Sequence, residues 1–144
     1  MRLLFAAALA VSMATGVAAA EHTINLINPA GPMRFDPEFL RIAPGDTVIF
    51  TATLDHDSDS IPKGIPDGAE GWKGNADEEI RVTFTVEGLY AFKCTPHFFD
   101  GMVGLIQVGD STVNAEVIAA LKMSPKATAR MGALLVQATT RAAP

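Results

Sequence analysis

CTPHFFDGM, at residues 94–102, is the segment that decides the fold of this chain. It holds the only cysteine, Cys94, followed by His97 three positions later and Met102 eight positions later. Another histidine, His56, stands well upstream. One thiolate, two imidazoles and one thioether form a donor set that suits copper and its one-electron chemistry. The sequence therefore predicts one copper site with the ligands His56, Cys94, His97 and Met102.

Side-chain parity places the candidate ligands on strands and loops. Successive side chains of a strand point to opposite faces, so Phe92 and Cys94 share one face. We expect the thiol to end a row of inward-facing side chains. His97 follows in a proline-containing loop, and Met102 opens the next strand. Three ligands thus come from one tight loop, while His56 comes from a distant loop.

Each candidate ligand also has an explanation that needs no metal. A lone buried cysteine usually acts as a small apolar residue, and a methionine such as Met102 is more often part of a core. His97 alone fits an exposed loop, and His22 is assigned no role. The C-x2-H-x4-M spacing at a strand–loop–strand junction favours a metal site over these separate explanations.

Other metals fit the sequence less well than copper. Asp55, Asp57 and Asp59 form an acidic cluster that lacks the spaced oxygens, the glycine and the final glutamate of an EF-hand calcium loop. Zinc accepts the same histidine and cysteine donors, so it would compete with copper in an overexpressing host.

Outward from this segment, residues 21–110 have the pattern of short strands. Apolar and polar residues alternate over 80–86, and Pro44-Gly45-Asp46 is a strong turn signal. Strands are also expected at 39–43, at 48–52, from Gly88 onward and at 103–108. The stretch 55–79 is rich in Gly, Pro and Asp and is expected to be a loop. Short strands with regular turns predict an all-β sandwich or barrel.

The pattern changes after Asp110, where the hydrophobic period becomes about 3.6 residues. Residues 114–123 have an apolar helical face. Ser124 and Pro125 then match a helix N-cap followed by proline in the first turn. Residues 111–144 are therefore predicted to form two short helices, which pack on the sandwich because neither is stable alone.

Residues 1–20 have the features of a secretory signal peptide. A short apolar run follows Arg2, and Ala18-Ala19-Ala20 matches the small-residue cleavage rule. The run is too short to span a membrane, and no later segment approaches a span. An exported chain with one cysteine has no internal disulfide, which leaves pairing with another chain, a reactive thiol or a metal. The net charge of −5 disfavours a nucleic-acid partner.

Four segments resemble the cupredoxin family, and among cupredoxins the pseudoazurins: APGDTV at 43–48, IPDGAE at 65–70, KCTPH at 93–97 and GMVG at 101–104. The paired C-terminal helices fit pseudoazurins and argue against plastocyanin. The resemblance implies an eight-stranded Greek-key sandwich with one type 1 copper per chain. It implies a monomeric periplasmic electron carrier, not an enzyme, that receives electrons from an upstream donor and commonly delivers them to copper nitrite reductase in denitrification. The ligands implied are His56, Cys94, His97 and Met102.

The chain departs from this family at two places. The family usually has Asn after the first histidine ligand, where the amide braces the two ligand loops, but Asp57 stands here and its carboxylate cannot donate a hydrogen bond. The family also tends to surround its docking face with lysines. Here Lys63, Lys73 and Lys93 remain. Leu54 stands where the family often has a lysine, and Phe99 and Asp100 replace smaller or neutral residues. We therefore expect weak electrostatic docking to the usual partner.

Two other functions use the same residues. A copper carrier or buffer without redox duty would bind the same metal, and reversible one-electron cycling of a blue form would exclude it. A thiol enzyme would pair Cys94 with a histidine as nucleophile and base. The sequence supplies neither a group to orient that base nor an evident substrate pocket, so this function is disfavoured.

Overall fold

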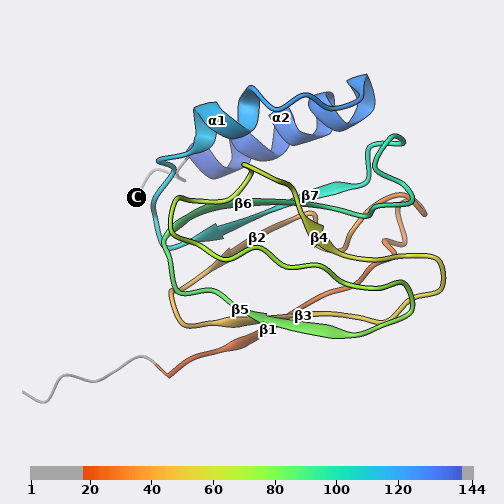
Figure 1. The fold of residues 1–144 in the computed structure, drawn as a ribbon, viewed down its shortest axis with the longest axis horizontal. Helices are drawn as coiled ribbons and strands as arrows, with labels where there is room; N and C mark the ends of the chain where they lie inside the picture. The colour runs from red at the N-terminus through yellow and green to blue at the C-terminus, as the bar shows by residue number, and fades with distance from the viewer. Residues whose placement is uncertain (1–17, 141–144) are drawn as a thin grey trace, which may run out of the picture.

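The computed structural model describes residues 18–140 as two β-sheets packed face to face, with two helices on the outer side of one sheet (Figure 1). Residues 1–17, which hold most of the predicted signal peptide, and residues 141–144 lie outside the described part. The strands are β1 (Glu21–Ile24), β2 (Phe39–Ile42), β3 (Thr47–Phe50), β4 (Asp59–Ser60), β5 (Ile80–Thr83), β6 (Gly88–Lys93) and β7 (Val103–Val108). The helices are α1 (Ala115–Ala119) and α2 (Pro125–Thr139).

The two sheets have the orders β1-β3-β5 and β2-β7-β6-β4. The β1–β3 and β2–β7 pairs are parallel, and the remaining pairs are antiparallel. From β1 to β6, each strand therefore lies in the other sheet from the strand before it, which ties the two halves of the sandwich together. The predicted all-β sandwich with two C-terminal helices is confirmed.

The number of strands differs from the expectation. Seven strands, not eight, form within residues 18–140. The stretch 61–79, which holds two prolines and four glycines, adds only an isolated bridge between Asp59 and Lys73. Proline lacks the amide that a sheet ladder needs, so this stretch stays irregular. The short strand β4 lies where the sequence predicted only loop.

The adjacent strands β6 and β7 form the centre of the larger sheet and are almost completely buried. Phe92 of β6 faces Gly104 of β7. A Cβ atom at Gly104 would collide with the Phe92 ring, so only glycine leaves room for this ring between the sheets. The ring also contacts the Phe35 and Phe50 rings, with centroids 4.7 and 5.4 Å away.

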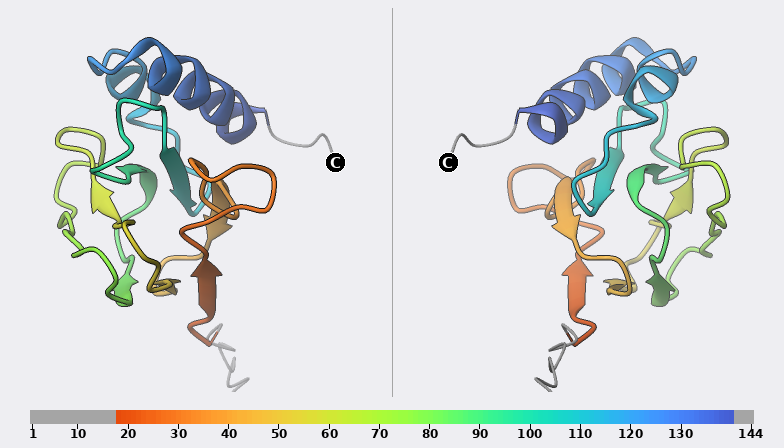
Figure 2. Two further views of the ribbon diagram at one scale, coloured as in Figure 1. Left: turned by 90° about the vertical axis from the view of Figure 1, so that its right-hand side faces the viewer. Right: turned by 90° about the vertical axis from the view of Figure 1, so that its left-hand side faces the viewer.

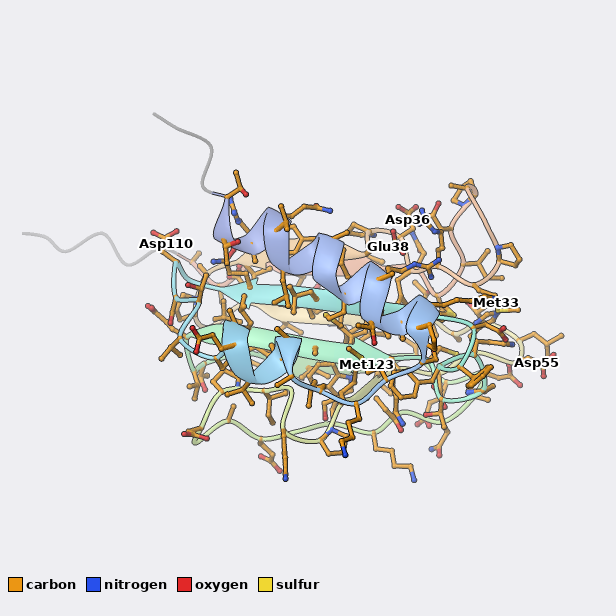
Figure 3. The ribbon with its side chains drawn as sticks, turned by 90° about the horizontal axis from the view of Figure 1, so that it is seen from above. Met33, Asp36, Glu38, Asp55, Asp110 and Met123 are labelled. Carbon is orange, nitrogen blue, oxygen red and sulfur yellow. The ribbon has the colours of Figure 1, made fainter. Side chains whose placement is uncertain are left out.

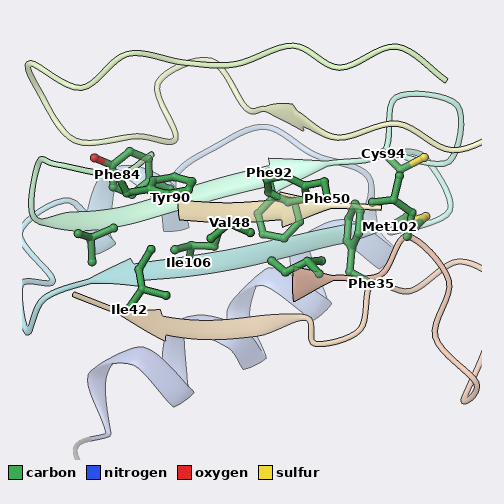
Figure 4. Packing of buried hydrophobic residues seen from close by; sticks show 13 residues of the cluster. Phe35, Ile42, Val48, Phe50, Phe84, Tyr90, Phe92, Cys94, Met102 and Ile106 are labelled. Atoms are coloured by element: carbon green, nitrogen blue, oxygen red, sulfur yellow. The ribbon is translucent and has the colours of Figure 1, made fainter. Parts of the chain in front are cut away.

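Side chains alternate along β6 and β7, so the larger sheet buries both of its faces. One face packs against the smaller sheet in an intersheet cluster that includes Phe92, Cys94 and Met102 (Figure 4). The other face packs under the helices in a helix-side cluster that includes Leu89 and Leu105. End-on views show the resulting three layers: helices, larger sheet and smaller sheet (Figure 2).

The helix α2 begins as the sequence predicted. The Ser124 hydroxyl accepts a hydrogen bond from the Ala127 amide at 3.2 Å, and Pro125 occupies the first helical position. The helix then buries Met131 and Leu134 against the sheet.

The helix α1 is shorter than the predicted 114–123. It ends at Ala119, and its N-cap residue, Asn114, makes no capping bond. The Asn114 side chain instead bonds the backbone of Leu89, accepting from its amide at 3.0 Å and donating to its carbonyl at 2.8 Å. The same residue therefore anchors the chain to β6 rather than starting a longer helix. Neither α1 nor α2 is both long and apolar enough to cross a membrane.

Candidate metal centre

Three of the four predicted ligands converge at one end of the sandwich. The Cys94 sulfur lies 3.6 Å from His56 Nδ1 and 3.5 Å from His97 Nδ1. One donor atom from each of these residues lies within 4.8 Å of the others. Cys94 and His56 are buried, while His97 is partly exposed. The loop before β4 thus meets the loop between β6 and β7.

The distances fit a metal ion shared by the three residues. Metal–nitrogen bonds of about 2.0 Å and metal–sulfur bonds of about 2.3 Å, spread at tetrahedral or trigonal angles, separate sulfur from nitrogen by roughly 3.6–3.8 Å. The observed separations are close to these values. One soft sulfur and two imidazoles suit copper or zinc and not a hard cation such as calcium.

Met102, the fourth predicted ligand, is completely buried and lies at the same end of the intersheet cluster as Cys94 (Figure 4). Its amide donates to the His97 carbonyl, and its carbonyl accepts from the Cys94 amide, both at 3.1 Å. The loop is therefore closed on itself by its own backbone. These bonds fix the Met102 backbone relative to the two loop residues that offer donor atoms.

Burial controls the protonation of the site before a metal binds. It raises the pKa of the Cys94 thiol to about 11, so the thiol is protonated at neutral pH. Burial, followed by the positive charge that His97 can carry, lowers the pKa of His56. His56 is therefore neutral and ready to bind a metal, whereas Cys94 must first release its proton.

Asp57 joins the two ligand loops even though it cannot donate a hydrogen bond. Its carboxylate accepts from the Thr95 amide at 2.5 Å. The Thr95 hydroxyl in turn donates to Asp59 at 3.0 Å. The missing amide donor at residue 57 is visible in the sequence, but this pair of acceptor contacts is not, because Thr95 carries no metal-binding group.

His22 and Asp55, which the sequence did not predict to be copper ligands, both have partners elsewhere in the fold. His22 lies within 2.8 Å of Asp46 and is absent from the cluster of donor residues. Asp55 has a left-handed backbone and donates its amide to the Asp77 carboxylate at 3.0 Å, which gives the acidic loop a structural role.

Two large apolar side chains that are close in sequence to His56 and His97 are exposed. Leu54 is 73% exposed and Phe99 is 79% exposed. The Lys93 ammonium lies 5.0 Å from the centre of the Phe98 ring. Asp100 has Lys126 as a partner, with 3.7 Å between the charged atoms. The charged side chains of this face are therefore partly engaged within the chain.

Comparisons with known proteins agree with this geometry. A model of the copper-binding proteins of the plastocyanin/azurin family matches residues 22–109. A pseudoazurin of Paracoccus pantotrophus is 42% identical over 135 residues, which cover 92% of this chain and 93% of the relative. A putative pseudoazurin of Rhizobium leguminosarum bv. viciae is 41% identical, over 95% of this chain and 92% of the relative. The crystal structure of a pseudoazurin from Methylobacterium extorquens AM1 matches with a TM-score of 0.76 and 35% identity, over 81% of this chain and 98% of the other.

Fold, donor set and similarity together define the class as cupredoxins. The chain belongs to the plastocyanin/azurin family of copper-binding proteins and, within that family, to the pseudoazurins. Its cofactor is copper, and it is a blue-copper electron carrier, not an enzyme.

Proposed function

We propose that this chain carries single electrons in the periplasm and delivers them to copper nitrite reductase. Its copper would be held by His56, Cys94, His97 and Met102. The observation that carries the proposal is the convergence of the Cys94 sulfur on two imidazole nitrogens at 3.5 and 3.6 Å. The predicted signal peptide at 1–20 supports export, and the similarity to pseudoazurins supports the partner.

The protein part of this function is to keep one geometry in both oxidation states. Bound copper supplies the one-electron couple, which thiolate and thioether bias toward Cu(I) while imidazole tolerates both states. His56 and Cys94 are buried, and the loop around Met102 is closed by its own hydrogen bonds. Fixed ligands require little rearrangement when an electron moves, which favours fast transfer.

The partly exposed His97 is the proposed exit for the electron. We define the docking face as the residues that neighbour the two histidines in the sequence: Leu54, Phe98, Phe99 and Asp100. A small apolar surface suits brief docking and quick release, as in other transient redox complexes. Asp100 is the single charged residue of this face and is paired with Lys126, so steering by charge should be weak.

Stopped-flow mixing of the reduced, copper-loaded protein with copper nitrite reductase tests the partner. We expect electron transfer with a shallow dependence of the rate on ionic strength. Phe99→Ala should slow the transfer several-fold, whereas Val113→Ala, which also changes an exposed apolar side chain, should not. A steep fall with salt would show that Lys63, Lys73 and Lys93 dominate docking. No transfer at any salt concentration would exclude this partner.

Location and assembly need separate measurements. Fractionation of cells that make the full-length chain should recover the copper protein from the periplasm. Residues 1–20 should have been removed from it by cleavage after Ala20. Size-exclusion chromatography with light scattering should give a monomer. Recovery of the full-length chain from the cytoplasm would contradict the export part of the proposal.

A further inference from the structure

Arg130 of α2 joins the helix to the loop that carries the predicted copper ligands. Its Nη1 donates to the Gly101 carbonyl at 2.5 Å and to the Met33 carbonyl at 2.7 Å. Its Nε lies 3.3 Å from the Glu38 carboxylate. Met33 and Glu38 lie close to α2, as the view from above shows (Figure 3). One guanidinium thus bonds carbonyl groups of two separate segments and pairs with one carboxylate.

The bond to Gly101 acts on the peptide unit that leads directly into Met102. Gly101 has a φ of +86°, in the left-handed region that favours glycine. A Cβ atom there would lie 3.0 Å from the Lys126 Cβ, so the loop packs closely against the first turn of α2. Its carbonyl accepts both the Arg130 bond and a 3.0 Å bond from the Val103 amide. The orientation of this peptide plane therefore depends on Arg130.

We propose that Arg130 is a positioning residue for Met102, through which α2 becomes part of the copper site. Within the ligand loop, Met102 is held by backbone bonds to His97 and Cys94. Arg130 adds a contact from outside that loop. Met102 would hold copper only weakly and would tune the site, so a small displacement of its backbone would change the environment of the metal. This inference rests on the proposed ligand set.

The guanidinium geometry suits this role better than its charge alone. A guanidinium presents several N–H donors in a fixed plane, whereas a lysine ammonium is a compact charge on a flexible stem. Arg130 is 21% exposed and its charge faces Glu38, which is 17% exposed. Arg130→Lys therefore keeps a charge opposite Glu38 but loses the planar group in which Nε faces Glu38 while Nη1 donates to both carbonyls.

Arg41 provides a control within the same chain. Its Nη2 donates to the Gln137 carbonyl at 2.9 Å, and its Nε donates to Gln107 Oε1 at 2.8 Å. Arg41 thus also ties α2 to the larger sheet, but near the end of the helix far from residue 101. If Arg130 only fastens the helix, replacing either arginine will have the same effect on the copper site.

The experiment compares Arg130→Gln, Arg130→Lys and Arg41→Gln in the copper-loaded protein. The first readout is the amide exchange of Met102 and Val103, measured by NMR in the reduced state. We expect exchange to accelerate by about tenfold or more in both Arg130 variants and by less than about twofold in Arg41→Gln. The second readout is the oxidised protein's visible and electron paramagnetic resonance spectra, which should change in the Arg130 variants only.

Three outcomes would overturn the proposal. Equal changes in Arg130→Gln and Arg41→Gln would show that Arg130 only docks the helix. Unchanged exchange and spectra would show that Met102 does not depend on it, and full restoration by Arg130→Lys would show that charge suffices. If Arg130→Gln does not fold, Arg130→Lys and Arg41→Gln decide by the same readouts. A wild-type protein without a blue form would instead contradict the proposed function. Amide exchange of Met102 and Val103 would then still test whether Arg130 holds the Gly101 carbonyl.

Discussion

The intersheet cluster and the helix-side cluster lie on opposite faces of the same two strands, yet they end differently. On β6, Phe92 points into the intersheet cluster, and the next residue of that row is Cys94. Leu89 and Ala91 point the other way, beneath the helices. Both rows are apolar and buried, but only the intersheet row ends in a sulfur that lies beside two imidazoles. Burial alone therefore does not define a metal site. The donor atoms at the end of the intersheet row define it.

The difference suggests that the two faces of the larger sheet have different roles. The intersheet cluster surrounds the donor atoms and sets their environment, since Cys94 and Met102 belong to it. The helix-side cluster fastens α2, whose side chains Met131 and Leu134 belong to it. Substitutions on the first face should therefore change both the stability and the spectrum, whereas those on the second should change mainly stability.

Loss of the thiol should have the largest effect. We expect Cys94→Ser to abolish the blue colour, because the equatorial thiolate defines the absorption of such a site. Met102→Leu should keep a blue form and shift its reduction potential, because the axial ligand is weak and tunes the site. Visible absorption of both copper-loaded variants checks this. An intense visible band in Cys94→Ser would refute the ligand assignment.

Truncation on each face tests the comparison directly. Phe92→Ala should cost about 3–5 kcal/mol of unfolding free energy and alter the copper spectrum, because it opens a cavity beside the donor residues. Leu89→Ala should cost about 2–5 kcal/mol and leave the spectrum unchanged. Chemical denaturation and visible spectra of the two copper-loaded variants measure both quantities. Equal spectral changes in both variants would remove the proposed division between the faces.

Copper binding should strengthen as the pH rises. The Cys94 thiol, whose pKa burial raises to about 11, must lose its proton when the metal binds, so affinity should rise about tenfold per pH unit near neutrality. Without copper, the folded chain retains a proton that the unfolded chain releases near pH 9.0, so stability should fall as the pH rises from there toward 11. Competition titrations and denaturation at several pH values measure both effects. A copper affinity independent of pH would contradict a protonated thiol.

Copper should also raise the melting temperature, because it binds only the folded arrangement of the ligands. The copper-free chain should still fold on its two apolar clusters. Calorimetry of the two forms at one pH provides the comparison, with copper-loaded Cys94→Ser as the control. Equal melting temperatures with and without copper would argue against a high-affinity site.

The smallest effect is expected at Asp57. Its negative charge near the site favours Cu(II), so Asp57→Asn should raise the reduction potential modestly, with screening by solvent limiting the shift. The asparagine oxygen can still accept from the Thr95 amide, so the contact between the loops should remain. Asp67→Asn is a charge-matched control, because Asp67 lies with Glu87 at the start of β6, at the end of this strand away from Cys94. Voltammetry of the three proteins measures the shift, and a lowered potential in Asp57→Asn would contradict the electrostatic argument.

The sequence predicted the local parts of the site well. The spacing of Cys94, His97 and Met102 lies within one loop, and alternation along β6 places the thiol inward. The N-cap at Ser124 is also a local pattern, and it was confirmed. These features depend on neighbouring residues and on the period of two or 3.6, so they are visible without tertiary structure.

Features that depend on distant contacts were missed. Arg130 lies 29 residues from Gly101 and bonds its backbone carbonyl, a group that every residue carries. The helix α1 is shorter than predicted because the Asn114 side chain bonds the backbone of Leu89, 25 residues earlier. The contacts of Thr95 with Asp57 and Asp59 depend on how the two loops meet. None of these leaves a periodic signal in the sequence.

A copper titration of the metal-free wild-type protein tests the central claim most directly. The claim is that His56, Cys94, His97 and Met102 form one copper site that exchanges single electrons. We predict an intense blue absorption that saturates at one copper per chain, disappears on reduction and returns in full on oxidation. A colourless copper complex, or a colour that does not return after one cycle, would contradict the account.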